Sequence, residues 1–385
     1  MNSFFFTSES VSQGHPDKTC DIISDALLDH FLSKENDARC AFECFATTNN
    51  IIIGGETRLK NHKVTNDEVE NLVRHKLKEI GHNYEGFSFD TVKITNLIHK
   101  QSEEIAHGVD ANSNKEEGAG DQGIMFGYAC METPMLMPAP IFYAHKILQH
   151  LAKYKNQGLG PDAKSQVTFE YVNGVAHKVS AVIVSIQHAK ELSLEDVRTK
   201  VMEVLEEVLP NMPVKEQIFI NPAGTFVMGG PVADTGLTGR KIIVDTYGGS
   251  APHGGGAFSG KDPTKVDRSA AYIARYLAKN IVNAGIAQRC TIQLSYAIGI
   301  AKPISVYVNT HGTTKGNVSD FDLSSFINKN IDLTPYGIRT RLKLNNPIYE
   351  PTASFGHFGR EFNKEKHLFL WEECDLKEVL QKWFN

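Results

Sequence analysis

The stretch Phe4-Phe-Phe-Thr-Ser-Glu-Ser-Val-Ser-Gln-Gly-His-Pro-Asp-Lys18 contains a short apolar run, a polar loop and the start of a helix, in that order. The apolar run predicts a strand at Phe4–Thr7. Pro16 suits a first helical turn, because the amide hydrogen that proline lacks would have no partner there. The same order occurs twice more at nearly equal intervals along the chain. The later pairs of strand and helix start are Ile124–Ala129 with Pro140, and Lys241–Thr246 with Pro263.

Each opening helix is followed by two strand-like runs and a second helix, as apolar periodicity indicates. The paired strands are expected at Phe42–Thr47 and Ile51–Thr57, Val167–Tyr171 and Lys178–Gln187, and Thr291–Ile298 and Ser305–Thr310. The second helices are expected at Asp67–Ile80, Leu194–Leu209 and Phe321–Ile327, and further strands at Val92–Leu97 and Gln217–Ile220. This order is β-α-β-β-α-β repeated three times, which is an α+β fold.

The repeat predicts three domains of similar size. Their boundaries are expected in the polar stretch Ser102–Asp121 and in the turn region Gly229–Gly239. The expected domains are residues 1–103, 118–231 and 232–385, with residues 104–117 as a linking loop.

The composition is that of an ordinary globular enzyme. The 385 residues are 41% hydrophobic and 22% charged, and the net charge of −5 gives no electrostatic basis for binding nucleic acid. The six cysteines form no C-x-x-C pair, so we expect reduced thiols and a cytoplasmic protein rather than a zinc site or a disulfide framework. No signal peptide and no membrane-spanning segment are expected.

The loop before Pro16 holds the first candidate chemistry. His15 and Asp17 flank the proline, and an acid in the first turn of a helix is common because the helix dipole favours it. The alternative is functional: Asp17 could hold Mg²⁺, and His15 could touch a phosphate at a helix N-terminus, where backbone amides favour anions.

A second candidate loop runs from Asp245 to Asp262 and is rich in glycine. Gly255–Lys261 fits the spacing G-x-x-x-x-G-K of a P-loop, but Asp262 follows where that motif needs Ser or Thr for magnesium. We therefore expect a loop that approaches phosphate without being a Walker motif, and we expect Asp262 to cap the helix that begins at Pro263. Lys265 and Asp267 lie near that helix start, where a solvated first turn explains them equally well.

Three further segments are informative only in combination. Arg240 and Lys241 are adjacent cations, and Lys164 stands just before a predicted strand. Such residues more often face solvent. The glycine-rich segment Gly118–Gly123 can be read as a simple turn into the strand at Ile124.

Together these segments resemble the S-adenosylmethionine synthetase (methionine adenosyltransferase) family over nearly the whole chain. The matching stretches are Phe6–Lys18, Gly118–Gly123, Asp162–Gln166 and Gly236–Asp267. The resemblance implies three similar α+β domains around a pseudo-threefold axis. It also implies a dimer or a dimer of dimers, with sites between subunits, that converts ATP, L-methionine and water to S-adenosylmethionine, phosphate and diphosphate. The family reaction is attack of sulfur on the 5′ carbon of ATP, followed by hydrolysis of triphosphate.

The resemblance also assigns roles to individual positions. It makes the catalytic set His15, Lys164, Arg240, Lys241 and Lys261. It makes the ATP-binding set His15, Asp162, Lys164, Thr225, Phe226, Asp234, Arg240, Lys241, Ala257 and Lys261. It places Glu56, Gln101, Asp121, Asp234 and Lys265 around methionine. It implies two Mg²⁺ ions per site, with Asp17 and Asp267 as ligands, one K⁺ per subunit at Glu43, and a mobile loop at Gln101–Asp110 that gates the site.

Two rival functions stay open at this point. A kinase or NTPase using the Gly255–Lys261 loop would transfer phosphoryl groups without needing methionine. A non-catalytic partner of an active synthetase is the other, but it would have no need to keep both metal carboxylates. Glu43, between Phe42 and Phe45, could be partly buried and need a positive partner, or it could face outward on an alternating strand.

Overall fold

The computed structural model describes residues 2–101 and 117–384, and it confirms the α+β class. Within these ranges no helix is both long and apolar enough to cross a bilayer. The helices are α1 (Pro16–Lys34), α2 (Asn66–Ile80), α4 (Ala139–Leu151), α5 (Leu194–Val208), α6 (Ile242–Asp245), α7 (Val266–Asn283), α8 (Asp320–Asn330), α9 (Pro335–Arg341) and α10 (Lys377–Phe384). The expected gating loop lies outside the described residues, except for Gln101.

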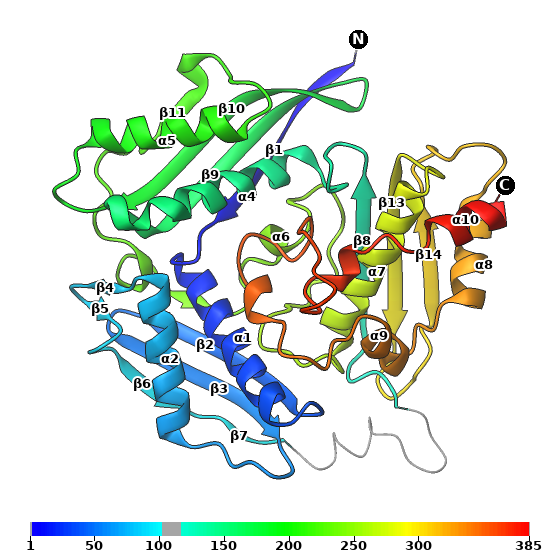
Figure 1. The fold of residues 1–385 in the computed structure, drawn as a ribbon, viewed down its shortest axis with the longest axis horizontal. Coiled ribbons are helices and arrows are strands. Elements are labelled where there is room, and N and C mark those ends of the chain that lie inside the picture. The colour runs from blue at the N-terminus through cyan, green and yellow to red at the C-terminus, as the bar shows by residue number, and fades with distance from the viewer. Residues whose placement is uncertain (1, 102–116, 385) are drawn as a thin grey trace.

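Among the described residues, three sheets have three or more strands, and helices cover one face of each of them (Figure 1). The first sheet has the order β1 (Ser3–Val11), β9 (Leu159–Val172), β10 (Val175–His188), β11 (Ile218–Ile220). The second has the order β12 (Gly236–Leu237), β2 (Arg39–Thr47), β3 (Asn50–Arg58), β6 (Lys93–Asn96), with β7 (His99–Lys100) also paired to β3. The third has the order β14 (Ser305–Asn309), β13 (Arg289–Tyr296), β8 (Gly123–Cys130). A small separate ribbon joins β4 (Asn83–Tyr84) to β5 (Phe87–Ser88).

The sheets do not follow the order of the chain. We call residues 2–101, 118–231 and 232–384 the first, middle and last segments. β1 pairs along its whole length with β9, so the first strand belongs to the sheet of the middle segment. β8 pairs with β13 of the last segment, and β12 pairs with β2 of the first. Each segment thus gives one strand to another segment's sheet, in a closed cycle. The domain limits expected above stay a prediction.

The predicted strands and helices are present, with two corrections. The strand expected at Lys241–Thr246 is wrong, since the short helix α6 occupies Ile242–Asp245. The β-branched residues of this run favour a strand locally. The strand that this part of the chain adds to a sheet is β12, just before the run, and it pairs with Phe45 and Ala46.

The second correction concerns the start of α7, which begins at Val266 rather than at Pro263. Its N-cap residue is Lys265, which makes no side-chain capping bond. Asp262 instead accepts hydrogen bonds from the amide and hydroxyl of Thr264 at 2.9 and 2.7 Å. It therefore forms a local turn before the helix and does not cap it.

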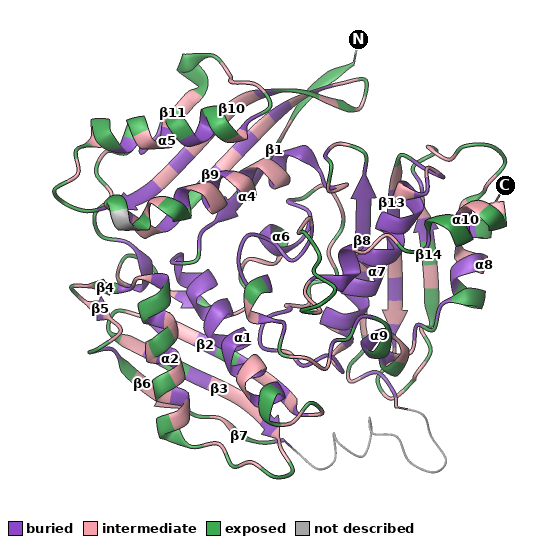
Figure 2. Ribbon diagram, viewed as in Figure 1, coloured by how far each residue is buried: buried purple, intermediate pink, exposed green. Residues whose placement is uncertain are grey.

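The helices α1 and α7 run through the interior and are buried along most of their length (Figure 2). α1 covers β2, and α7 covers β8 and β13. Unusually for interior helices, both carry buried charges, which must be paired to be tolerated. Lys18 of α1 pairs with Asp245 at the end of α6, and Asp25 of α1 pairs with Arg268 of α7.

Candidate active site

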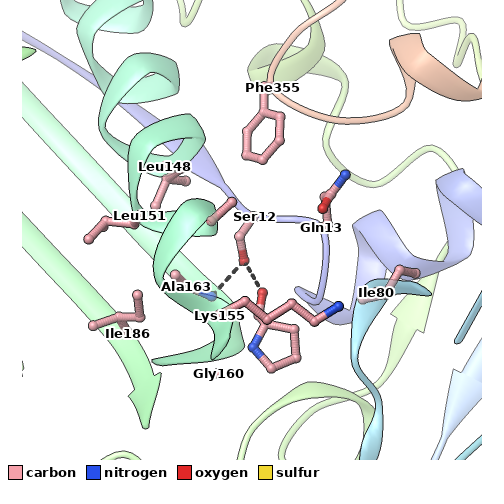
Figure 3. A pocket seen from close by; sticks show the side chains of 12 residues that line it. Ser12, Gln13, Ile80, Leu148, Leu151, Lys155, Gly160, Ala163, Ile186 and Phe355 are labelled. Carbon is pink, nitrogen blue, oxygen red and sulfur yellow. Dashed lines mark hydrogen bonds between the residues drawn. The ribbon is translucent and has the colours of Figure 1, made fainter. Parts of the chain in front are cut away.

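The loop between β1 and α1 is fixed to the start of β9. Ser12 Oγ donates to the carbonyl of Pro161 at 2.6 Å and accepts from the amide of Ala163 at 2.7 Å (Figure 3). The amide of Gly14 donates to the same Pro161 carbonyl at 3.0 Å. A Cβ on Gly14 would lie 2.5 Å from the Pro161 ring, so only glycine allows this approach. The loop thereby places His15 at the start of α1.

His15 is a buried, neutral hydrogen-bonding group. Burial, with the nearby Lys241 and Lys164 cations, lowers its pKa to about 3, against the opposing effect of Asp17. Its Nδ1 accepts the backbone amide of Asp17 at 3.2 Å. In a neutral ring with Nδ1 as acceptor, the proton is on Nε2. His15 can therefore donate one hydrogen bond from Nε2 to a ligand oxygen.

Asp17 is ionised and points toward the segment that carries the adjacent cations. Its Oδ1 accepts the amide of Leu237 at 2.9 Å, and its Oδ2 accepts Lys241 Nζ at 2.5 Å. The guanidinium of Arg240 lies 3.7 Å from Oδ1. Burial acts to raise the pKa of Asp17, but the bonds from Lys241 and Leu237 outweigh it and leave the pKa below its usual value.

Lys164 and Asp162 lie beside this group on β9. Lys164 is exposed and stands opposite Val11 in the β1–β9 register. Asp162 is buried and accepts the amide of Gly230 at 2.7 Å, and its burial raises its pKa to about 6.

The remaining predicted ATP contacts lie on loops. Phe226 is held by His188, whose Nε2 accepts the Phe226 amide at 3.1 Å, while Thr225 and Asp234 are exposed. Ala257 is close to Gly239, where an added Cβ would lie 2.5 Å from the alanine methyl.

A second group of site residues lines a cavity of about 360 Å³. The predicted residues it brings together are Glu56, Gln101, Asp121, Lys261, Lys265 and Asp267. Gln101 Nε2 donates to Glu56 at 3.4 Å, and Lys261 Nζ donates to Asp267 at 2.5 Å. The cavity therefore combines carboxylates and ammonium groups around an open volume, as a polar, zwitterionic ligand requires.

Arg39 and Arg58 also line this cavity, and the sequence analysis did not identify them as site residues. They stand directly opposite each other on β2 and β3, two pairs along from Ala41 and Glu56. Strand alternation puts Glu56 and Arg58 on one face, so the signal was present in the strand pattern.

The two groups are separate within one chain. Lys261 forms a β-bridge with Ala41, and Leu237 pairs with Phe45 at the other group. Four residues of β2 separate these anchor points, which is about 13 Å at the usual rise of a strand. Among the described residues, no hydrogen bond or ion pair joins the group of His15 to the group of Lys261.

Glu43 follows the outward-facing reading. It is exposed on the open face of β2 and lies opposite Gly54. It is not partly buried in the single chain, because the covered face of β2 carries Phe42 and Cys44. The K⁺ assignment stays a prediction.

Comparison with known proteins identifies the family. Family models match along the chain: S-adenosylmethionine synthetase N-terminal domain at residues 3–103, central domain at 116–226 and C-terminal domain at 228–373. The chain belongs to the S-adenosylmethionine synthetase family. The S-adenosylmethionine synthase of Rhodospirillum centenum is 54% identical, covering 100% of this chain and 99% of that protein. Those of Jannaschia sp. and Zymomonas mobilis are 56% and 55% identical, covering 99% and 100% of this chain and 98% and 99% of those proteins.

Membership of the S-adenosylmethionine synthetase family establishes the enzyme class. The chain is a methionine adenosyltransferase and takes part in S-adenosylmethionine biosynthesis. Nothing in these comparisons supports the kinase or NTPase alternative. The geometry agrees, because Lys261 bonds to Asp267 and α7 begins only at Val266, so the loop does not open directly into a helix N-terminus as a P-loop does.

Proposed function

We propose that each active site is assembled from two chains of a homodimer. One chain supplies the group of His15, Asp17, Lys164 and Lys241, and the other supplies the group of Lys261 and Asp267. The observation that carries this proposal is the separation of the two groups along β2. Both groups hold cations suited to phosphate, yet their anchor points on β2 are about 13 Å apart in one chain.

The chemistry follows from the substrates. Methionine sulfur attacks the 5′ carbon of ATP, so the S–C5′ bond forms as the C5′–O bond breaks and triphosphate leaves. A thioether has no proton to lose, so no general base is needed at sulfur. Alignment of sulfur and carbon contributes roughly 7–11 kcal/mol. Stabilisation of the departing triphosphate contributes about 3–4 kcal/mol for each well-placed donor.

Different residues stabilise the departing oxygen, the polyphosphate and methionine. His15 donates from Nε2 to the departing oxygen, while Lys164, Arg240, Lys241 and Lys261 neutralise the polyphosphate. Water then hydrolyses the triphosphate, held by the same cations, to phosphate and diphosphate. The other nucleotide contacts are Asp162, Thr225, Phe226, Asp234 and Ala257. Methionine is bound by Glu56, Gln101, Asp121, Asp234 and Lys265.

Asp17 and Asp267 suit Mg²⁺ chemically. Each is a carboxylate now paired with a lysine, and Mg²⁺ in nucleotide sites takes one or two carboxylates plus substrate phosphates and waters. When bound, the ions would neutralise charge on the polyphosphate. We place two Mg²⁺ per site at these residues, and one K⁺ per subunit at Glu43. A partner subunit covering the open face of β2 would supply the burial that Glu43 lacks.

We also propose that the enzyme works in the cytoplasm, as a dimer or a dimer of dimers. All six cysteines are free, and five of them are buried, as a reducing compartment favours.

Subunit mixing tests the shared site. His15→Asn and Lys261→Ala homodimers should each be nearly inactive, because every site loses one charge-stabilising group. The two variants are then mixed equally, unfolded and refolded together. Random pairing gives about half heterodimers, each with one doubly altered site and one intact site, so activity should recover to roughly a quarter of wild type.

Subunit exchange is verified independently with differently tagged chains. If exchange is complete and activity does not recover, His15 and Lys261 serve one site from the same chain, and the shared-site proposal is wrong.

A further inference from the structure

Helix α1 carries an aspartate at every fourth position: Asp17, Asp21, Asp25 and Asp29. Residues four apart lie on nearly the same helix face, about 6 Å apart along the axis. We call these four residues the aspartate ladder, and each aspartate with the groups that it binds is one rung. Each of them accepts backbone amides from a loop of the last segment, and the loops follow one another along the helix.

The upper rungs hold the segment that leads to Arg240 and Lys241. Asp17 accepts the amide of Leu237 at 2.9 Å, and Asp21 accepts the amide of Gly239 at 2.8 Å. These two bonds fix the backbone immediately before the adjacent cations.

A buried cation completes the Asp21 rung. Lys18 Nζ donates to Asp21 at 2.9 Å and also to Asp245, at the end of α6. All three side chains are almost wholly buried. The segment from Gly239 to Asp245 is therefore tied to α1 at both ends, with Arg240 and Lys241 between the ties.

The third rung holds the loop that carries Lys261. Asp25 accepts the amide of Gly260 at 2.8 Å and both terminal nitrogens of Arg268 at 2.6 and 2.8 Å. Arg268 in turn donates to the carbonyls of Phe258 and Lys261 at 3.0 and 3.4 Å. The backbone on both sides of Gly260 is thus bound to one buried ion pair.

The fourth rung makes the same kind of contact without a site residue. Asp29 accepts the amides of Tyr349 and Glu350 at 2.8 to 3.0 Å, and that loop carries none of the proposed ligands. Its loop lies against the Arg268 guanidinium, which is 4.2 Å from the Tyr349 ring, so the Asp29 rung is an internal control chiefly for the Asp21 rung.

We propose that Asp21 and Asp25 are positioning residues for the reaction. Asp21 sets the backbone that aims Arg240 and Lys241, and Asp25, with Arg268, sets the backbone that aims Lys261. This rests on the proposed function, because it assigns each rung to one of the two residue groups that meet in a shared site. A single helix thus sets the spacing of both groups.

The test compares Asp21→Asn, Asp25→Asn and Asp29→Asn in the full-length enzyme. Asparagine cannot satisfy all the donors that each carboxylate accepts, so all three variants lose hydrogen bonding to a part of the last segment. Asp21→Asn and Asp25→Asn also remove the charge that pairs with Lys18 and Arg268, so thermal stability is measured for each variant. We expect kcat to fall about 10-fold to 100-fold for the first two, since small misplacements of reacting groups have costs of this size. Inhibition by tripolyphosphate should weaken in the same two variants, and Asp29→Asn should stay within about twofold of wild type.

A purely structural role would give a different pattern. Activity would then fall only in proportion to the fraction of folded enzyme, whichever variants lose thermal stability, and tripolyphosphate inhibition of the folded fraction would be normal. Should Asp25→Asn fail to fold, Arg268→Lys keeps the cation but loses donors to the Phe258 and Lys261 carbonyls, and it should show the same kinetic defect. Normal kcat and normal tripolyphosphate inhibition in folded Asp21→Asn would overturn the proposal.

Mixed dimers assign each rung to its group. Asp21→Asn should be complemented by Lys261→Ala and not by His15→Asn, whereas Asp25→Asn should be complemented by His15→Asn and not by Lys261→Ala. The reverse pattern would contradict the assignment. If even His15→Asn and Lys261→Ala fail to complement each other, the shared site is wrong, and the kinetics of the single variants still decide whether the rungs position the cations.

Discussion

At the scale of single residues, Asp17 has two roles that compete. In the chain alone it neutralises Lys241 and receives the Leu237 amide. In the proposed complex it also faces Mg²⁺, while Lys241 turns to phosphate. The lysine therefore holds the carboxylate ionised and in place until substrate arrives.

Asp17→Asn should leave the fold intact and slow S-adenosylmethionine formation about 100-fold, because a bound metal supplies several kcal/mol of charge stabilisation. The asparagine carbonyl can still accept the Leu237 amide. Initial rates over a range of Mg²⁺ concentrations measure this, with the exposed Asp90→Asn as control. A near-normal rate at ordinary Mg²⁺ would exclude Asp17 as a ligand.

Buried histidines make stability depend on pH. His82 is wholly buried between Thr19 and Tyr84, and burial, with a smaller effect of Lys155, lowers its pKa from 6.5 to about 3. Between these values the unfolded chain binds a proton that the native state does not. The free energy of unfolding therefore falls as pH drops through about 6.5, by up to about 1.4 kcal/mol per pH unit for this one residue.

His82→Gln should reduce that slope by about one proton, as urea unfolding between about pH 5 and pH 6.5 will measure. The exposed His177→Gln should leave the slope unchanged. An unaltered slope in the His82 variant would mean that the native ring is protonated in this range.

The role of a residue could be predicted where a local motif indicated it. It could not be predicted where the role depends on a partner far away in the sequence. His15 and Asp17 stand in a recognisable order around Pro16, and the structure places both at a helix start. Asp21 and Asp25 gave no such signal. Their importance depends on amides more than 200 positions away, which only the folded chain brings to α1.

At the scale of elements, periodicity identified the long helices and central strands well. It failed at Lys241–Thr246, where β-branched residues favour a strand but the chain forms the short helix α6, which Lys18 of α1 binds through Asp245. It also misplaced the start of α7, because Pro263 begins a turn fixed by Asp262. Both errors occur beside the site, where loops bound to α1 override local preference.

The packing of α7 on β8 depends on a glycine. A Cβ on Gly127 would lie 2.0 and 2.1 Å from the carbonyl carbon and oxygen of Ala274 and 2.4 Å from the amide of Arg275, all backbone atoms. Gly127→Ala should therefore push α7 from the sheet and lower the free energy of unfolding by about 3 kcal/mol, at the upper end of overpacking costs.

Gly54→Ala is the matched control, since its added methyl on β3 meets nothing within 4 Å. Urea unfolding measures the free energy of unfolding of both variants. Equal stability of the two would show that α7 can shift without cost.

At the scale of the whole molecule, the cyclic exchange of strands makes the three segments interdependent. Removing any one segment leaves a strand without its partner in another. Residues 118–231 alone keep β8 but lose β13, and keep β9 but lose β1. We expect this fragment not to unfold cooperatively.

Joining residues 2–11 ahead of residues 118–231 should restore a cooperative transition, because β1 then covers the open edge of β9. Circular dichroism during urea unfolding compares the two fragments, and a version with residues 2–11 scrambled is the control. If the fragment without β1 unfolds as sharply, the exchanged strand is dispensable.

The pairing of β1 with β9 also determines how late the first strand can enter its sheet during synthesis on the ribosome. Thr7 and Thr168 face each other in this pair and are 161 residues apart. At about 5–20 residues per second, the first strand waits roughly 10–30 s for its neighbour to be made. Throughout that interval Phe4, Phe5 and Phe6 have no sheet to join. The nascent chain therefore exposes an apolar segment that a chaperone with an apolar binding surface is suited to cover.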